Sequence, residues 1–141
     1  MTLEELFIDT GFLIALESSD DRHHEAAQDC WHELVVLKPI FFTTSYVFDE
    51  TVTYFNSRGR HDKAVEIGNR LLNSSSTTFI HVDESYFDEG WKYFKMHQDK
   101  SYSLTDCISF VAMIHFSIRK SLTFDKHFGQ AGFECVPRLN Q

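Results

Sequence analysis

Four acidic residues stand where apolar segments of this chain end or where its expected helices start. Asp9 closes the apolar run of residues 6–8, and Asp125 closes a later apolar run. Glu50 and Asp106 fall near the starts of two expected helices. If the fold brings these carboxylates together, they repel one another unless a cation lies among them. Mg²⁺ and Mn²⁺ prefer oxygen ligands, and such a site can activate a water molecule for phosphodiester hydrolysis.

Each acid also has a plain structural explanation. Asp106 is the only Asp, Glu, Lys or Arg between residues 104 and 118, but Ser103 to Asp106 matches a helix capping box. Capping explains Asp106, taken alone, at least as well as chemistry does. Asp9 suits an N-cap between a strand and a helix, and Asp125 suits a turn. Only their joint placement favours a shared site, in which mutual repulsion should raise the pKa of at least one acid.

Glu50 is harder to explain as an ordinary surface residue. Its neighbours three and four positions away on a helix are Tyr46, Val47 and Tyr54, so we expect it on a largely apolar face. Asp49 is then the acid that faces solvent.

The elements that must position these acids alternate along the chain. Apolar runs predict strands at about residues 6–8, 40–44, 77–82, 121–125 and 133–136, with helical patterns between them, the most apolar at 104–118. Strands alternating with helices indicate a parallel sheet covered on both faces. The carboxyl ends of such strands meet at one edge, where open α/β sheets bind ligands. The acids are therefore expected to converge there.

The composition sets limits on the protein. A length of 141 residues predicts one domain, residues 1–141, and a net charge of −8 speaks against binding nucleic acid by charge alone. It does not exclude a nuclease that grips phosphates through metal ions. The three cysteines show no C-x-x-C pattern, and the N-terminus shows no signal peptide, so we expect a reduced, cytoplasmic protein without a membrane span.

Four motifs carry a resemblance to a known family. They lie at residues 7–11 (Phe-Ile-Asp-Thr-Gly), 44–51, 103–110 and 122–133, so the resemblance extends over nearly the whole chain. With these motifs the sequence resembles the PIN domain family, specifically its VapC-type toxin ribonucleases. The resemblance implies a three-layer α/β/α sandwich whose central, mostly parallel sheet has four or five strands.

The resemblance also implies the chemistry and the partners. It makes Asp9 and Asp106 the principal ligands of Mg²⁺ or Mn²⁺, directly or through water. Glu50 and Asp125 would complete the charge and help to orient the attacking water, and the Thr10 hydroxyl would support the pocket. The implied activity is metal-dependent endoribonuclease cleavage of transfer RNA or another structured RNA, as the toxin of a toxin–antitoxin pair. The implied protein partners are an antitoxin and a second copy in a homodimer.

The basic and histidine residues give weaker signals. Most basic residues are expected on an ordinary solvated surface, and Arg58, Arg60 and Lys126 are the candidates for contacts with RNA phosphates. No histidine pair has the spacing of a known metal motif. We expect His115 in the core, and His127 lies close enough to Asp125 in sequence to touch substrate, but receives no role here.

Three other functions remain to be weighed. A non-catalytic PIN-like protein that binds a partner would keep the acids for folding, and would show no metal-dependent cleavage. A haloacid-dehalogenase-type phosphotransferase also uses an acid at a strand end, but it needs a second Asp where this chain has Gly11. A signalling receiver domain needs adjacent acids after its first strand, and this chain has only Asp9 there.

Overall fold

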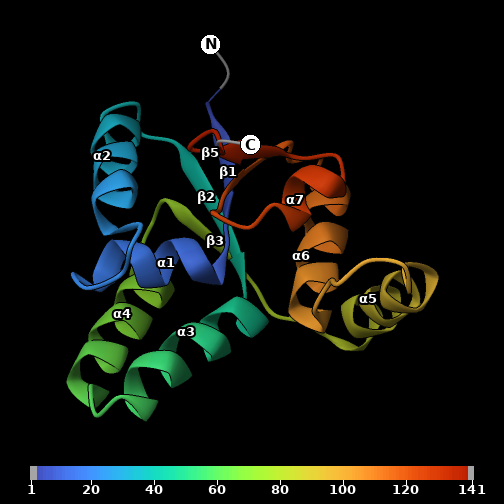
Figure 1. Ribbon diagram of the computed structural model, residues 1–141, viewed down its shortest axis with the longest axis horizontal. Helices are drawn as coiled ribbons and strands as arrows, with labels where there is room; N and C mark the ends of the chain where they lie inside the picture. Colours follow the sequence, from blue (N-terminus) through green and yellow to red (C-terminus); the bar gives the residue numbers. More distant parts are fainter. Residues whose placement is uncertain (1–2, 140–141) are drawn as a thin grey trace.

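The centre of the protein is a five-stranded sheet in the order β3-β2-β1-β4-β5 (Figure 1). The structure is a computed structural model that describes residues 3–139. All four strand pairings are parallel, as expected for strands linked through helices. The strands are β1 (Glu5–Ile8), β2 (Ile40–Thr44), β3 (Thr77–Ile80), β4 (Lys120–Leu122) and β5 (Glu134–Val136).

Helices cover both faces of the sheet. Helices α1 to α4 lie on one side of it in Figure 1, and α5 to α7 lie on the other. Their bounds are α1 (Thr10–Glu17), α2 (His24–Val35), α3 (Ser45–Ser57), α4 (His61–Asn73), α5 (Glu84–Met96), α6 (Leu104–His115) and α7 (His127–Gln130). The three-layer α/β/α sandwich with a parallel sheet, predicted above, is confirmed. None of the helices described is long and apolar enough to cross a bilayer.

The direction of the strand order reverses between β1 and β4. From β1 the chain proceeds to β2 and β3 on one side, then crosses to β4 and β5 on the other. The carboxyl ends of β1 and β4 therefore diverge into loops that leave toward opposite faces. Such a switch point leaves a crevice in which α/β proteins bind ligands. Asp9 follows β1 directly, and Asp125 follows β4 by three residues.

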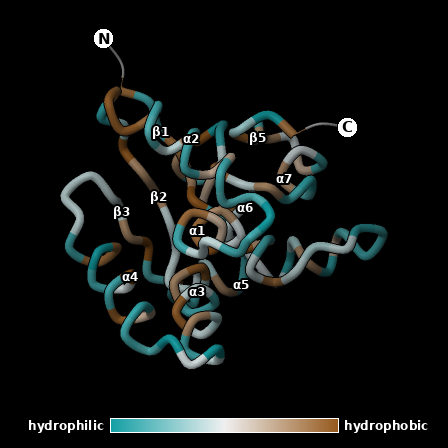
Figure 2. Tube along the Cα trace, turned by 60° about the vertical axis from the view of Figure 1, so that its left-hand side comes forward, coloured by the Kyte–Doolittle hydropathy of each residue, from teal (hydrophilic) through white to brown (hydrophobic). Residues whose placement is uncertain are grey.

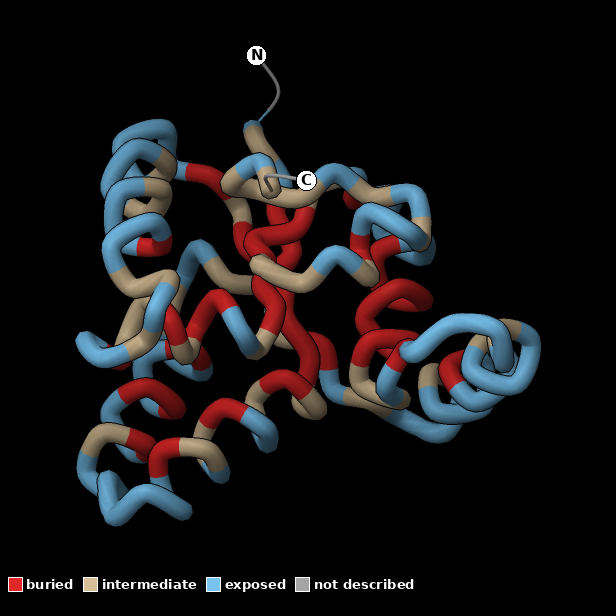
Figure 3. Tube along the Cα trace, in the orientation of Figure 1, coloured by how far each residue is buried: buried red, intermediate tan, exposed pale blue. Residues whose placement is uncertain are grey.

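Phenylalanine fills much of the core. Phe7 of β1 and Phe110 of α6 both pack against Phe128, with ring centroids 6.3 and 4.9 Å apart. Helix α6 is buried from Asp106 to Met113, as the continuous red stretch in Figure 3 shows. Helix α4 instead alternates hydrophobic and hydrophilic positions (Figure 2), because only one of its faces meets the sheet layer.

The third and fourth strands and helix α6 are shorter in the structure than the sequence predicted. The third strand was expected at 77–82 but ends at Ile80. The fourth strand was expected at 121–125 but ends at Leu122, because the Thr123 hydroxyl accepts the backbone N–H of Asp125 and closes a turn. Helix α6 was expected to reach residue 118 but ends at His115, and Ser117 adopts a left-handed φ of 56°. His115 is exposed, so its placement in the core was wrong.

Candidate metal-binding active site

Asp9 is held at the junction of β1 and α1. It is the N-cap of α1, and its Oδ1 accepts the backbone N–H of Thr10 at 2.8 Å. Its other oxygen, Oδ2, accepts the Thr123 hydroxyl at 2.8 Å. Burial, opposed by the Thr123 hydrogen bond and reinforced by the charges of Asp106 and Asp125, raises the pKa of Asp9 from 3.8 to about 7. A carboxyl group with this pKa carries a charge that its surroundings compensate poorly.

Asp106 reaches the same region from the first turn of α6. The capping box expected from the sequence is present: the Ser103 hydroxyl accepts the Asp106 N–H, and Asp106 Oδ2 accepts the Ser103 N–H, both at 3.0 Å. Burial is the main cause that raises the Asp106 pKa, and the charge of Asp125 raises it further. Asp106 is therefore a helix cap and a member of the acid cluster at once.

A tight turn after β4 places Asp125 beside Asp9. The Thr123 hydroxyl donates to Asp9 and accepts the backbone N–H of Asp125 at 2.9 Å, so one side chain positions both acids. Asp125 Oδ1 in turn accepts the His127 backbone N–H at 2.9 Å. Thr123 was not singled out from the sequence, although its position two residues before Asp125 is the spacing of a local side-chain turn.

His127 joins Asp106 to Asp125. Its Nδ1 lies 3.2 Å from Asp106 Oδ2 and 3.2 Å from Asp125 Oδ1. The three side chains bring one potential ligand atom each within 4.8 Å of one another. Sequence reasoning gave His127 no role because it looked for histidine pairs, whereas the useful signal was the Asp125-x-His127 spacing across the turn.

Glu50 meets the cluster through Thr10. The Thr10 hydroxyl donates to Glu50 Oε1 at 2.7 Å, while the Thr10 N–H binds Asp9. The helix neighbours of Glu50, namely Val47, which is buried, and Tyr46 and Tyr54, which are half-buried, form the largely apolar face that was expected, but the Glu50 side chain itself is exposed, as is Asp49. The structure thus connects Thr10 to two of the four acids.

The three candidate phosphate-binding residues come from two parts of the chain, the end of α3 and the turn after β4. The Arg58 guanidinium lies 3.6 Å from the Tyr54 ring centroid and donates to the Tyr54 carbonyl, which holds it at the end of α3. The Ser18 hydrogen bond is the main cause that lowers the Asp20 pKa, and the charges of Arg60 and Arg58 lower it further, so both arginines lie near the turn after α1. Lys126 is exposed and follows Asp125 directly. Of the three, Lys126 lies nearest in the chain to the acid cluster.

The donor set fits a hard divalent cation. Within residues 3–139 no Lys or Arg forms an ion pair with any of the four acids, and His127 is their one basic partner. Two of the acids have raised pKa values, mainly because they are buried and further because of the charges of the neighbouring carboxylates. The carboxylate oxygens suit Mg²⁺ or Mn²⁺.

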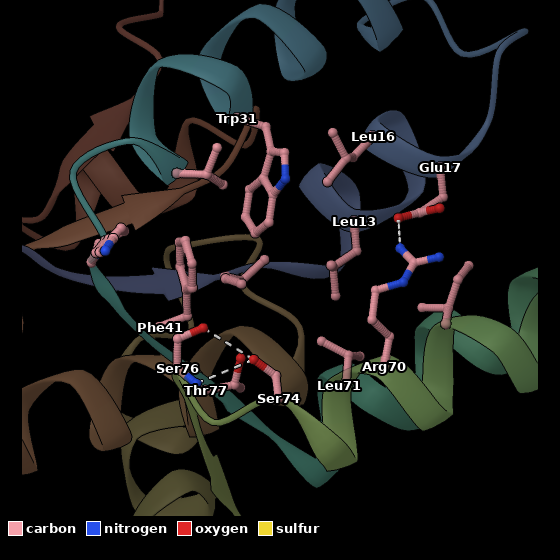
Figure 4. Close-up of a pocket in the computed structure, with 15 residues that line it drawn as sticks. Leu13, Leu16, Glu17, Trp31, Phe41, Arg70, Leu71, Ser74, Ser76 and Thr77 are labelled. Carbon is pink, nitrogen blue, oxygen red and sulfur yellow. Dashed lines mark hydrogen bonds and ion pairs between the residues drawn. The ribbon is translucent and has the colours of Figure 1, made fainter.

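A separate apolar pocket lies between α1, α2, α4 and the sheet (Figure 4). Its volume is about 390 Å³, and Leu13, Trp31, Phe41 and Leu71 point into it. An ion pair between Glu17 and Arg70 borders it, and Glu17 also binds Lys63. None of the four acids lines this pocket, so it is chemically distinct from the acid cluster.

The fold and sequence match known proteins. The model of the PIN domain family matches residues 6–134. The chain is 31% identical over 128 residues to the 23S rRNA-specific endonuclease VapC20 of Mycobacterium tuberculosis, a match that covers 91% of this chain and 95% of the relative.

Solved structures agree with this match. The crystal structure of M. tuberculosis VapC20, described as a sarcin–ricin loop cleaving toxin, superposes with a TM-score of 0.82 at 30% identity, over 91% of this chain and 95% of that one. FitAcB from Neisseria gonorrhoeae superposes with a TM-score of 0.64 at 15% identity, over 96% of each chain. The second match shows a shared fold alone.

Proposed function

Because the chain belongs to the PIN domain family, and within it to the VapC-type toxin ribonucleases, we propose that its acid cluster hydrolyses RNA phosphodiester bonds with a divalent metal ion. The observation that carries this proposal is the convergence of Asp9, Asp106 and Asp125 at the switch point of the sheet. Two of these acids have raised pKa values, and among residues 3–139 neither forms an ion pair with a Lys or Arg. Burying these carboxylates does not favour folding, so the cluster is better explained as a site for a cation.

The proposed roles follow from how each side chain is held. Asp9 and Asp106 are the principal metal ligands, because both are buried and fixed by backbone donors. Asp125 and Glu50 complete the negative charge and help to orient the attacking water. Thr10 positions Glu50 relative to Asp9. When bound, Mg²⁺ or Mn²⁺ supplies Lewis-acid stabilisation of the phosphate and lowers the pKa of water.

His127 extends the set beyond the four acids. Its imidazole lies in reach of both Asp106 and Asp125, so it fixes the relative position of the two carboxylates. It does for this pair what Thr123 does for Asp9 and Asp125. We propose a positioning role for His127.

The proposed substrate is 23S ribosomal RNA at its sarcin–ricin loop, in preference to transfer RNA. Support comes from VapC20, a 23S rRNA-specific endonuclease described as a sarcin–ricin loop cleaving toxin, which is 31% identical over 91% of this chain. We propose a cytoplasmic location, because ribosomal RNA is the proposed substrate. The proposed protein partners are a cognate antitoxin that blocks the site and a second copy of the chain.

The test uses purified protein, denatured and refolded to remove any bound antitoxin. Ribosomes and bulk transfer RNA are incubated with it in Mn²⁺, and cleavage is mapped by primer extension. The wild type and Asp49→Asn, an exposed acid on the same helix as Glu50, should cut the sarcin–ricin loop, and Asp106→Asn should not. The Asn side chain can still accept the Ser103 N–H, so the helix cap survives. Cleavage of transfer RNA alone would overturn the substrate. Failure to cut either RNA would favour a non-catalytic, partner-binding PIN protein.

A further inference from the structure

A wide groove opens beside the acid cluster, on the side of Asp125. It lies between the start of α2 and the α7–β5 segment, with Phe124 between these two walls, and its volume is about 1300 Å³. This exceeds the roughly 300–1,000 Å³ typical of sites for small molecules. Asp125 lines the groove and also belongs to the acid cluster, so the groove is continuous with the candidate active site.

The charge of the groove differs from that of the whole protein. The chain has a net charge of −8, yet the groove is lined by three cations, Arg22, Lys126 and Arg138. Within the part of the chain that the structure describes, none of the three forms an ion pair. Besides Asp125, Glu134 is the one acid on its walls. Unpaired cations gathered along an open groove are complementary to a polyanion.

An aromatic column reaches the same groove from the core. Phe12 is fully buried and stacks on Phe124 at 5.7 Å, and Phe124 stacks on His23 with ring centroids 4.3 Å apart and planes 6° apart. Phe124 and His23 are half-exposed and line the groove. A packed column fixes the orientation of its outermost ring. Fixed aromatic rings along a basic groove form the usual platform for unpaired bases.

We propose that this groove, bounded by Arg22, Lys126 and Arg138, binds the single-stranded RNA segment that flanks the phosphate cleaved at the acid cluster. The cations contact successive phosphates, and His23 stacks on an unpaired base. The inference rests on the proposed ribonuclease function and adds the path of the substrate. Lys126 then contacts the RNA along this path. Arg58 and Arg60 do not, because neither lines the groove.

The salt dependence of RNA binding tests the groove. A fluorescein-labelled hairpin with the sarcin–ricin loop sequence is titrated by anisotropy, in an Asp106→Asn background that prevents cleavage. The test variant is Arg22→Gln/Lys126→Gln/Arg138→Gln. The control is Lys92→Gln/Lys95→Gln/Arg119→Gln, which removes the same charge at cations that do not line the groove. The slope of log K against log salt should fall by about 2 in the test variant. Affinity at low salt should fall more than tenfold there and change little in the control.

The outcomes separate this inference from the proposed function. Equal losses in the two triple variants, or no loss in either, would overturn the groove as the binding site. If the wild type cuts RNA but the groove variant binds the hairpin as tightly as its Asp106→Asn parent, the groove is not the binding site and the proposed function stands. If the wild type binds the hairpin through the groove yet never cuts RNA, the function fails and the groove stands. If no RNA binds at all, both fail.

A second pair of variants tests whether a base stacks on His23. His23→Ala should weaken hairpin binding by about tenfold, and His23→Phe should retain it, because a phenyl ring preserves the column on Phe124. Thermal melting of both variants checks that the fold is intact. Equal binding by His23→Ala and the parent protein would show that no base stacks there.

Discussion

At the scale of single residues, the raised pKa of Asp9 makes the stability of the folded protein depend on pH. Its pKa is raised to about 7, so between roughly pH 4 and 7 the folded protein holds a proton that the unfolded chain has lost. Stability should therefore fall as pH rises through this window, by on the order of 2–4 kcal/mol in metal-free protein. Asp9→Asn should be more stable than the wild type at pH 8, with a shallower pH dependence.

Urea unfolding in EDTA from pH 4.5 to 8 measures this effect. Asp49→Asn is the control, because Asp49 is exposed and should leave the wild-type pH dependence unchanged. Some slope should remain in Asp9→Asn, since the Asp106 pKa is also raised. If Asp9→Asn keeps the full wild-type slope, Asp9 is not the group that titrates.

Thr123 gives a second prediction at this scale. Its buried hydroxyl donates to Asp9 and accepts from the Asp125 backbone. Thr123→Val keeps the shape but leaves a backbone N–H without its partner, so it should cost about 1–3 kcal/mol of stability and reduce RNA cleavage. Thr123→Ser keeps the hydroxyl and should restore both. Full cleavage by a folded Thr123→Val would show that the acids need no such alignment.

At the scale of elements, the contact between α5 and α6 depends on one small residue. A Cβ on Gly90 would lie 2.5 Å from Ile108 Cγ1, an atom close to the α6 backbone that cannot easily move. Gly90→Ala should therefore destabilise the protein by about 1–3 kcal/mol through overpacking, despite the better helix propensity of Ala.

Chemical denaturation of Gly90→Ala against Gly129→Ala checks this packing. A Cβ at Gly129 meets only Cys135 Sγ, at the ordinary contact distance of 3.7 Å, so this control should be nearly neutral. A Gly90→Ala protein as stable as the control would mean that α5 can shift away from α6 without cost.

At the scale of elements, the sequence predicted the arrangement of the strands but missed several local features. The alternation of apolar runs and helical patterns predicted the parallel sheet, and the strand expected at 40–44 coincides with β2 (Ile40–Thr44).

The end of β4 was missed because the Asp125 backbone N–H donates to the Thr123 hydroxyl and replaces strand geometry with a turn. Hydropathy does not report such a hydrogen bond. The exposure of the Glu50 side chain was not predicted, because helix periodicity gives a face but not the depth at which neighbouring elements cover it. The raised acid pKa values were foreseen from repulsion, but burial is the larger cause.

At the scale of the whole molecule, the fold should be stabilised by the metal. A divalent ion that binds the folded protein alone stabilises it by about 2.7 kcal/mol at a hundredfold excess over Kd. For a chain of this length we expect Mn²⁺ to raise the melting temperature by about 5–10 °C relative to EDTA. Asp106→Asn should lose most of this response, and Asp49→Asn should keep it. An equal rise in both variants would place the ion elsewhere.

The central claim is that the converging acids use a metal ion to cut RNA. The most direct measurement is the rate of ribosomal RNA cleavage by refolded protein, as Mn²⁺ is raised from zero in EDTA to saturation, for the wild type and for folded Asp106→Asn. The account predicts no cleavage in EDTA, a rate that saturates with Mn²⁺ in the wild type, and a loss of at least a hundredfold, about 2.7 kcal/mol, in the variant. Cleavage that persists in EDTA, or an Asp106→Asn protein as active as the wild type, would contradict it.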